Sequence, residues 1–227
     1  HCAICEDPRQ YVSPMGQQWT TLDHLRAAHR NAWRREEPKL WSIRTEPGFG
    51  IQQQAWLVAT PHGNVLWDCI TLLDDATIDL IQALGGIQAI AISHPHYYST
   101  MIEWSQAFGD VPVYLHELDR DWVQRTSPRV VFWSGASHQL LPGLTLVHCG
   151  GHFDGYQVLH WAGSREGRGA ILAGDQPQVA MDRRWVTFLY SYPNMVPLSE
   201  AAVERITRAL EPYEYDRLYV ACGRHVL

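Results

Sequence analysis

The 227-residue sequence has no long hydrophobic run and no strongly basic segment. Its longest apolar stretches, such as residues 89–92 and 170–173, fall far short of the roughly 20 residues that a membrane helix needs. No basic cluster is longer than Arg34-Arg35 or Arg183-Arg184, and the net charge is −6. We therefore expect neither a membrane nor a nucleic acid as partner, and a small-molecule substrate instead.

Cysteine is scarce, and its odd count of 5 does not match the disulfide framework of a small secreted protein. A reducing compartment fits better, so we expect a cytoplasmic location. The sequence begins at His1 rather than at Met and ends inside an apolar run, as a piece of a longer chain would. Its 46% of hydrophobic and 19% of charged residues predict a sizeable core and exclude general disorder.

Strand and helix patterns alternate along most of the chain, which indicates the α/β class. Residues 1–47 are polar and contain a helix-like stretch at 20–37, so we interpret them as a small N-terminal appendage to a main domain at 48–227. Two strands around a turn at 61–63 predict a hairpin. Further helices are expected at 74–84, 99–108, 119–124 and 199–210, and further strands at 87–92, 111–115, 130–133, 144–148, 156–161, 169–173 and 217–221. This pattern favours packed sheets with helices outside.

Histidine and aspartate recur just after the expected strands. The positions are Asp68, His94, His96, His152, Asp175 and His225. Loops at strand ends bring distant side chains together, so this series predicts a metal site assembled from loops. Each motif alone also has a simpler interpretation: His94-Pro95-His96 can be two solvated turn histidines, and Asp175 can cap a turn. The order of the motifs favours the metal site.

In that order the motifs resemble those of the metallo-β-lactamase-fold hydrolase superfamily. Asp68, His94-Pro95-His96, Gly151-His152, Gly174-Asp175 and His225 match its series over residues 50–227. The resemblance implies a four-layer αββα sandwich with the metal site at one edge between the sheets. It also implies that His94, His96 and His152 hold an ion, with Asp175 as the fourth ligand or as a carboxylate facing the bound water.

The sequence departs from the superfamily where its His-x-His motif continues with Asp-His. Tyr98 and Ser99 stand at these positions, which hold the second metal in dinuclear members. Of that second position only Asp175 and His225 remain, so we expect one tightly bound ion. Asp68 is expected to fix the His94 loop by hydrogen bonds without touching the metal.

Three imidazoles and a carboxylate suit zinc, which lowers the pKa of a bound water to about 7. We therefore predict a mononuclear hydrolase acting on an ester, lactone, thioester or amide, in which Tyr98 or its neighbour Tyr97 donates a hydrogen bond to the developing oxyanion. Two alternatives stay open. One is a non-haem iron oxygenase, since the persulfide dioxygenases of the superfamily bind iron at positions equivalent to His94, His152 and Asp175. The other is a catalytically degenerate binding scaffold.

Cys2 and Cys5 form a Cys-x-x-Cys pair, which is half of a tetrahedral zinc site. His24 and His29 are candidate partners, although their spacing fits only loosely. We favour a second pair upstream, because the chain resembles a subgroup of the superfamily that carries an upstream Cys-x-x-Cys. In that case Cys2 and Cys5 are half of a structural zinc ribbon.

Overall fold

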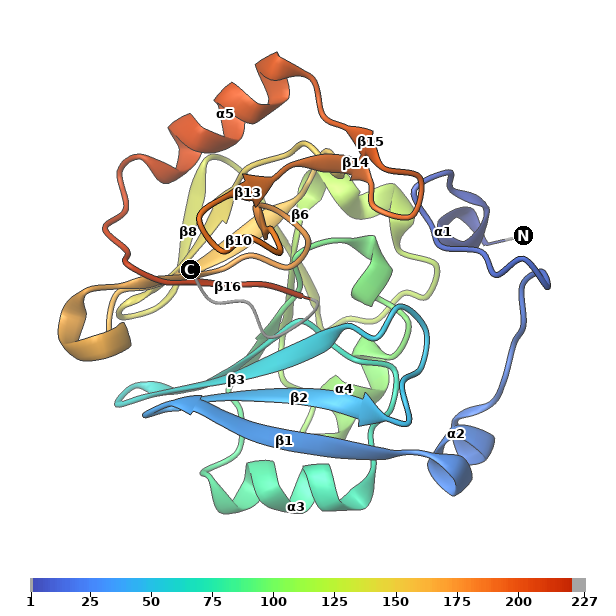
Figure 1. The fold of residues 1–227 in the computed structure, drawn as a ribbon. Helices are drawn as coiled ribbons and strands as arrows, with labels where there is room; N and C mark the ends of the chain where they lie inside the picture. The colour runs from blue at the N-terminus through green and yellow to red at the C-terminus, as the bar shows by residue number, and fades with distance from the viewer. Residues whose placement is uncertain (1, 222–227) are drawn as a thin grey trace.

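The computed structural model describes residues 2–221, which form two packed sheets with helices on their outer faces (Figure 1). The first sheet has the order β1 (Arg30–Glu37), β2 (Leu40–Glu46), β3 (Gln54–Thr60), β4 (Gly63–Trp67), β5 (Ala89–Ala91), β6 (Val113–His116) and β7 (Val130–Trp133). The second has the order β16 (Leu218–Tyr219), β11 (Ala170–Leu172), β10 (Gln157–Trp161), β9 (Leu144–His148) and β8 (Ser137–Leu141).

Helices and short ribbons complete the structure. The α-helices are α1 (Ala3–Glu6), α2 (Leu22–Ala28), α3 (Asp75–Ala83), α4 (Met101–Ala107) and α5 (Glu200–Leu210). The 3-10 helices are η1 (Pro95–Tyr97), η2 (Glu117–Trp122) and η3 (Ser164–Gly167). Two ribbons pair β12 (Gln178–Val179) with β13 (Val186–Thr187) and β14 (Leu189–Ser191) with β15 (Val196–Pro197).

Three apolar clusters separate four layers, as the strand β3 illustrates. Its Trp56 and Val58 pack against the second sheet, whereas Ala55 and Leu57 pack against residues of α3 and α4. This alternation follows from the two-residue repeat of a strand, and both faces of β3 are covered. A third cluster joins the second sheet to α5, on the opposite side of the molecule from α3 (Figure 1). The expected αββα sandwich is therefore confirmed.

Most elements lie where the sequence pattern predicts them. The expected hairpin is β3 and β4, paired antiparallel around a turn at 61–62, with Gly63 already in β4. The backbone N–H of Thr77 donates to the Asp74 side chain at 2.8 Å, which caps α3, and Ser199 caps α5 in the same way. The strand β8 was missed by the sequence pattern. It pairs with β9 at the edge of the second sheet.

The helix expected over residues 20–37 is wrong beyond its first turns. Thr21 caps α2, but α2 ends at Ala28 and the chain continues as β1, antiparallel to β2. Residues 30–37 contain Ala, Arg and Glu, which favour helix locally. Pairing along β2 overrides that preference, and charged residues suit the edge of a sheet. The first sheet consequently begins upstream of the boundary that we expected at residue 47.

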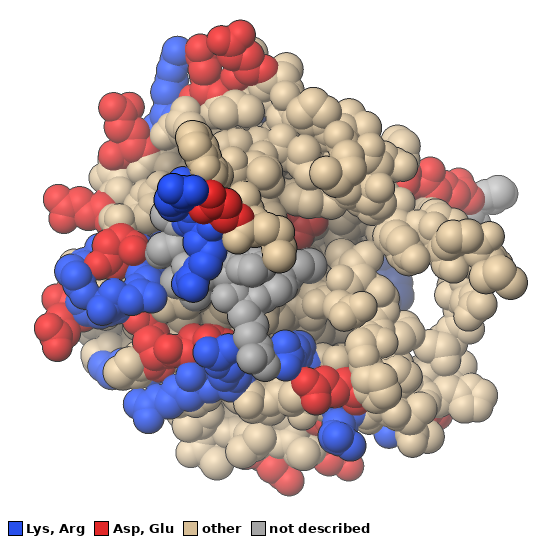
Figure 2. Space-filling model, in the orientation of Figure 1, with Lys and Arg blue, Asp and Glu red and all other residues tan. Residues whose placement is uncertain are grey.

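The surface carries both signs of charge. Figure 2 shows Lys and Arg interspersed with Asp and Glu on the viewed face, together with an opening between the N-terminal segment and the body of the molecule. Within the part of the chain that the structure describes, none of the helices has the length and apolar character needed to span a bilayer.

Candidate metal centre

His94 and His96 follow β5 at the edge between the two sheets. The backbone of His94 is extended, and η1 then begins at Pro95, so His96 lies on a 3-10 turn. The two rings are 4.9 Å apart between centroids. His94 is fully buried. Because both residues follow the end of the central strand β5, their imidazoles share one small space.

His152 is carried by the loop after β9. Gly150 and Gly151 have φ angles of +63° and +99°, in the left-handed region that glycine adopts readily. A Cβ atom on Gly151 would lie 2.6 Å from the side-chain nitrogen of Gln176. The same nitrogen donates to the carbonyl of Gly150 at 2.9 Å, which ties this loop to the one that carries Asp175.

Asp175 follows β11 through Gly174, whose φ angle is +54°. A Cβ atom at Gly174 would lie 2.5 Å from the Ser93 Oγ atom, so only glycine lets the two strand ends approach this closely. The hydroxyl of Tyr192 donates to the backbone carbonyl of Asp175. The loop that carries Asp175 is therefore held both by its close approach to Ser93 and by the hydrogen bond from Tyr192.

These four side chains meet at one point. One ligand atom from each of His94, His96, His152 and Asp175 lies within 4.8 Å of the others. The Asp175 Oδ2 atom is 3.6 Å from the Nε2 atoms of both His94 and His152. Neighbouring ligands of a tetrahedral zinc ion are about 3.4 Å apart. The spacing therefore fits an ion at the centre.

The hydrogen bonding of the histidine nitrogens also fits a bound ion. The Nε2 atoms of His94, His96 and His152 are all buried, and none has a hydrogen-bond partner within residues 2–221. A buried polar atom without a partner costs free energy, so native structures rarely leave several together. A cation that accepts their lone pairs removes that cost.

Burial sets the protonation of the cluster. It lowers the pKa of His96 to about 4 and that of His152 to about 3, and it also holds the pKa of His94 well below its usual value. Burial raises the pKa of Asp175 to about 7. The imidazoles are thus neutral at physiological pH, which is the form that binds metal.

Asp68 reaches His94 through Ser93. The Ser93 backbone N–H and hydroxyl donate to the two Asp68 oxygens at 2.7 Å and 3.1 Å. With its own proton given to Asp68, the Ser93 Oγ atom can only accept from His94 Nδ1, which lies 2.8 Å away. This series of hydrogen bonds places the imidazole proton of His94 on Nδ1 and leaves Nε2 free for a metal.

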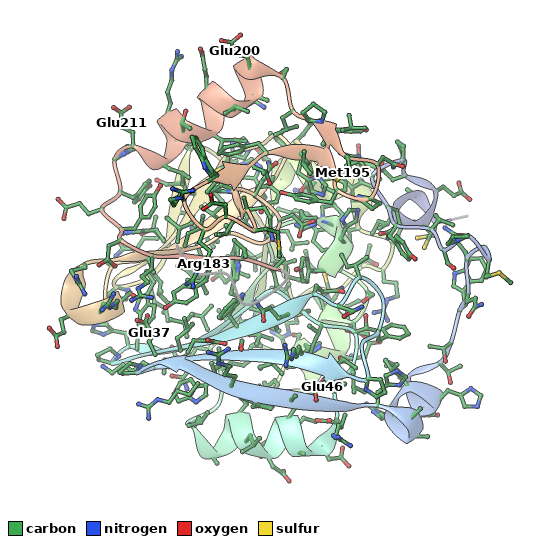
Figure 3. All side chains as sticks on the ribbon, in the orientation of Figure 1. Glu37, Glu46, Arg183, Met195, Glu200 and Glu211 are labelled. Atoms are coloured by element: carbon green, nitrogen blue, oxygen red, sulfur yellow. The ribbon has the colours of Figure 1, made fainter. Side chains whose placement is uncertain are left out.

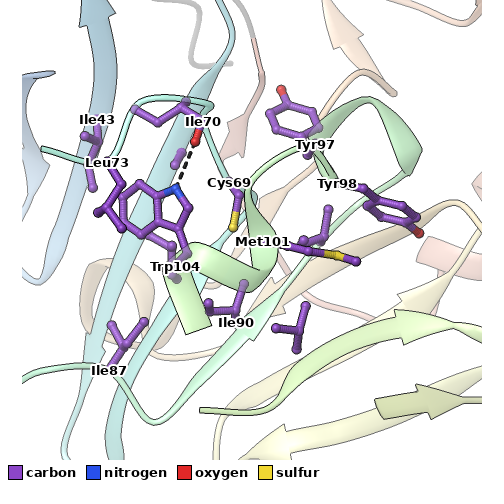
Figure 4. Close-up of a cluster of buried hydrophobic side chains, with 14 of the residues drawn as sticks. Ile43, Cys69, Ile70, Leu73, Ile87, Ile90, Tyr97, Tyr98, Met101 and Trp104 are labelled. Carbon is purple, nitrogen blue, oxygen red and sulfur yellow. Dashed lines mark hydrogen bonds between the residues drawn. The ribbon is translucent and has the colours of Figure 1, made fainter. Parts of the chain in front are cut away.

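Tyr98 is not brought into the site. It is 5% exposed and packs with Met101 and Trp104 in the apolar cluster under α4 (Figure 4). Burial holds its pKa well above the usual value. Tyr97 lies in the same cluster, although its ring also contacts that of His94 at 5.2 Å. A pocket of about 460 Å³ opens over the metal-binding cluster, and neither tyrosine is among the described residues that line it. The expected oxyanion role of Tyr98 thus has no geometric support.

Two further expectations concern the chain ends. His225 lies outside the described residues. Cys2 and Cys5 are half-buried free thiols, and burial together with a hydrogen bond to Cys2 raises the pKa of Cys5 to about 11. Within residues 2–221 neither His24 nor His29 joins them in a group of three metal-binding side chains.

A pocket of about 460 Å³ opens over the cluster. His96, His152 and Asp175 line it, and Arg9, Gln10 and Tyr11 form an N-terminal part of its wall. An adjoining hollow of about 690 Å³ runs under residues 10–22 and also reaches His96. Neither this N-terminal wall nor the role of Ser93 could be predicted from the sequence, because both depend on contacts between distant segments.

Comparison with known proteins places the chain in a family. It is 52% identical over 227 residues to the uncharacterised protein YmaE of Bacillus subtilis, covering 99% of this chain and 82% of YmaE. No family model matches the chain.

Solved structures share the fold. The metallo-β-lactamase FIM-1 from Pseudomonas aeruginosa, in a mono-zinc form, superposes with a TM-score of 0.63 at 14% identity, over 86% of this chain and 88% of FIM-1. TTHA1623, in a di-iron-bound form, superposes with a TM-score of 0.54 at 25% identity, over 77% of this chain and 89% of TTHA1623. The chain therefore belongs to the same family as YmaE and has the metallo-β-lactamase fold.

Proposed function

We propose that this protein is a metal-dependent hydrolase in which His94, His96, His152 and Asp175 hold one divalent ion. The observation that carries the proposal is the set of three buried Nε2 atoms that find no hydrogen-bond partner among residues 2–221 and that surround one point together with the Asp175 carboxylate. Zinc suits this donor set and, when bound, would supply a water with its pKa lowered to about 7.

The residues around the ion have separate tasks. The three imidazoles bind as neutral ligands, since burial keeps their pKa values low. Asp175 completes the donor set and carries negative charge toward the pocket that opens over it. Amide side chains of Gln10, Gln52 and Gln178 line the wall and can orient a neutral polar substrate. An ester, lactone, thioester or amide fits these requirements.

A single ion is part of the proposal. At the superfamily's positions for a second metal this chain has Tyr98 and Ser99, and Tyr98 is buried in the apolar cluster. Within the described part of the chain, no fifth His, Cys, Asp or Glu joins the group of four.

The test is metal stoichiometry together with hydrolysis. Protein stripped with a chelator should bind one equivalent of zinc and regain hydrolysis of at least one member of a panel of esters, lactones, thioesters and amides. His152→Ala should lose the ion and the activity. His62→Ala, at an exposed turn, is the matched control and should keep both. Protein that binds no divalent ion would leave the binding-scaffold interpretation standing and contradict the proposal.

One observation favours a second candidate, a mononuclear iron oxygenase acting on a persulfide. The Asp175 Oδ2 atom is the same 3.6 Å from His94 and from His152, and two histidines with one carboxylate suit ferrous iron. Iron in natively expressed protein, with oxygen uptake on a persulfide substrate, would select this candidate. Zinc with ester hydrolysis would select the first.

A further inference from the structure

Residues 7–9 of the N-terminal segment pack directly against the loop that carries His152. The Arg9 Nε and Nη2 atoms donate to the two Asp7 oxygens at 2.6 Å and 2.7 Å, and Nη1 donates to the backbone carbonyl of His152 at 2.6 Å. Both side chains are nearly buried, with exposed fractions of 11% for Arg9 and 7% for Asp7. Every nitrogen of the guanidinium is therefore used, and the third bond holds the backbone of a candidate metal ligand.

The same guanidinium also stacks on the aromatic ring next to His152. Its Cζ atom lies 3.8 Å from the centroid of the Phe153 ring, in the range of a close cation–π contact. The Phe153 ring in turn contacts all three histidines, with centroid distances of 5.6 Å to His94, 5.1 Å to His96 and 5.1 Å to His152. Arg9 thus supports the imidazoles through two routes, the His152 carbonyl and the Phe153 ring.

The segment itself is held in place by the β14–β15 ribbon. The carbonyl of Pro8 accepts from the Asn194 side chain at 3.0 Å and from the Ser191 hydroxyl at 3.5 Å. Met195 marks the turn of this ribbon beside α1 (Figure 3). Residues 7–9 are therefore anchored to the β14–β15 ribbon on one side and contact the His152–Phe153 loop on the other.

Charge makes the Asp7 partner necessary. A lone guanidinium beside a cation site would repel the ion, and at low dielectric this repulsion is large. Burial would raise the pKa of Asp7, but hydrogen bonds and charge from Arg9 outweigh it and hold that pKa below its usual value. The pair is consequently ionised and neutral overall at physiological pH.

We propose that Arg9, neutralised by Asp7, is a positioning residue of the metal centre that fixes the His152–Phe153 loop in its ligating geometry. This inference rests on the proposed function, since it concerns the ion that the four ligands hold. It also means that the N-terminal segment is part of the site.

The test compares zinc affinity, measured by competition with a chelator, between wild-type protein and Arg9→Ala. The chain offers a matched control, because Asp182 and Arg184 form the same Asp-x-Arg pair on the surface, with exposed fractions of 48% and 82%. Substitution of a residue that supports a metal ligand typically lowers the metal affinity by about 10- to 100-fold. We expect Arg9→Ala to weaken zinc binding within that range and Arg184→Ala to leave it unchanged.

Two further variants separate positioning from general stability. Arg9→Lys keeps the charge but loses the fork that makes three bonds, so it should not restore affinity. Asp7→Asn leaves the Arg9 charge uncompensated and should weaken zinc binding as well. Both remain informative if Arg9→Ala does not fold, and thermal unfolding of the metal-free variants checks their folding.

The results distinguish failure of the positioning role of Arg9 from failure of the proposed function. Unchanged zinc affinity in folded Arg9→Ala, or full recovery in Arg9→Lys, would overturn the positioning role while leaving the metal centre intact. Wild-type protein that binds no zinc would instead overturn the proposed function, and the role of Arg9 with it.

Discussion

At His94, the direction of one imidazole depends on Ser93 and Asp68, which do not face the pocket. Ser93 donates two hydrogen bonds to the buried Asp68 carboxyl group, so its hydroxyl oxygen offers only a lone pair to His94 Nδ1. Burial raises the pKa of Asp68 to about 8, against the lowering effect of the Ser93 hydrogen bonds. The sequence could predict His94 and Asp68 from their places after strands. It could not predict Ser93, which is an ordinary residue until the fold puts Asp68 next to it.

Ser93→Ala should weaken zinc binding because the imidazole proton is no longer held on Nδ1. We expect a loss of about 10- to 100-fold in affinity, measured by chelator competition. Ser105→Ala is the control, since Ser105 on α4 is also buried and its hydroxyl donates to the Val111 carbonyl, away from the site. Equal affinity in the two variants would contradict the role of Ser93.

Asp119 predicts a pH dependence of stability. It is 1% exposed, and its Oδ1 atom accepts from the Gly155 N–H at 2.7 Å. Burial raises its pKa from 3.8 to about 7. Because the pKa is higher in the folded state, the stability that this group contributes is complete below pH 3.8 and is lost as the pH rises to about 7.

Asp119→Asn keeps the oxygen acceptor and removes the charge. Its free energy of unfolding relative to wild type should therefore increase by about 2 kcal/mol between pH 5 and pH 8, measured by urea unfolding. Asp121→Asn, on the exposed side of the same 3-10 helix, should show no such increase. A difference between Asp119→Asn and wild type that stays constant with pH would show that the Asp119 carboxyl titrates normally.

At the scale of elements, strand ends decide how close the ligands come. The strands β3 and β4 and the capping of α3 could be predicted, because short apolar runs around a turn and a capping Asp74 are local sequence signals. The strand β1 could not, because its residues favour helix and only pairing with β2 makes them extended. Contacts such as that between Arg9 and His152, 143 residues apart, leave no local pattern at all.

Gly174→Ala tests the close approach of β11 to the end of β5. The new Cβ atom would meet Ser93 and Tyr156 in addition to the strain of a positive φ angle. We expect a loss of at least about 3 kcal/mol in the free energy of unfolding. Gly109→Ala has a positive φ angle of +82° but no atom within 4 Å, so it should cost only about 1–2 kcal/mol. Equal costs would mean that the strand ends are not tightly packed.

At the scale of the molecule, the sandwich holds the candidate ligands on loops from both sheets. His94 and His96 follow the first sheet, whereas His152 and Asp175 follow strands of the second. The layered fold could be predicted from the order of the motifs, and so could the four side chains that form the candidate metal-binding cluster. The wall made by residues 9–11 could not, since nothing in a polar N-terminal segment indicates where it will pack.

Because the ligands come from both sheets, a bound ion should stabilise the whole fold. Zinc at 100 times its dissociation constant should add about 2.7 kcal/mol, which corresponds to a rise of about 5–10 °C in Tm for a chain of this size. A thermal melt with and without zinc measures it. His94→Ala should show no rise, and an equal rise in this variant would place the zinc elsewhere.

The most direct measurement is anomalous diffraction at the zinc edge from crystals of the zinc-loaded protein. We predict one strong peak about 2.0–2.2 Å from a nitrogen of each of His94, His96 and His152 and from an oxygen of Asp175. A peak elsewhere only, or none at these four residues, would contradict the metal centre on which the proposed function depends.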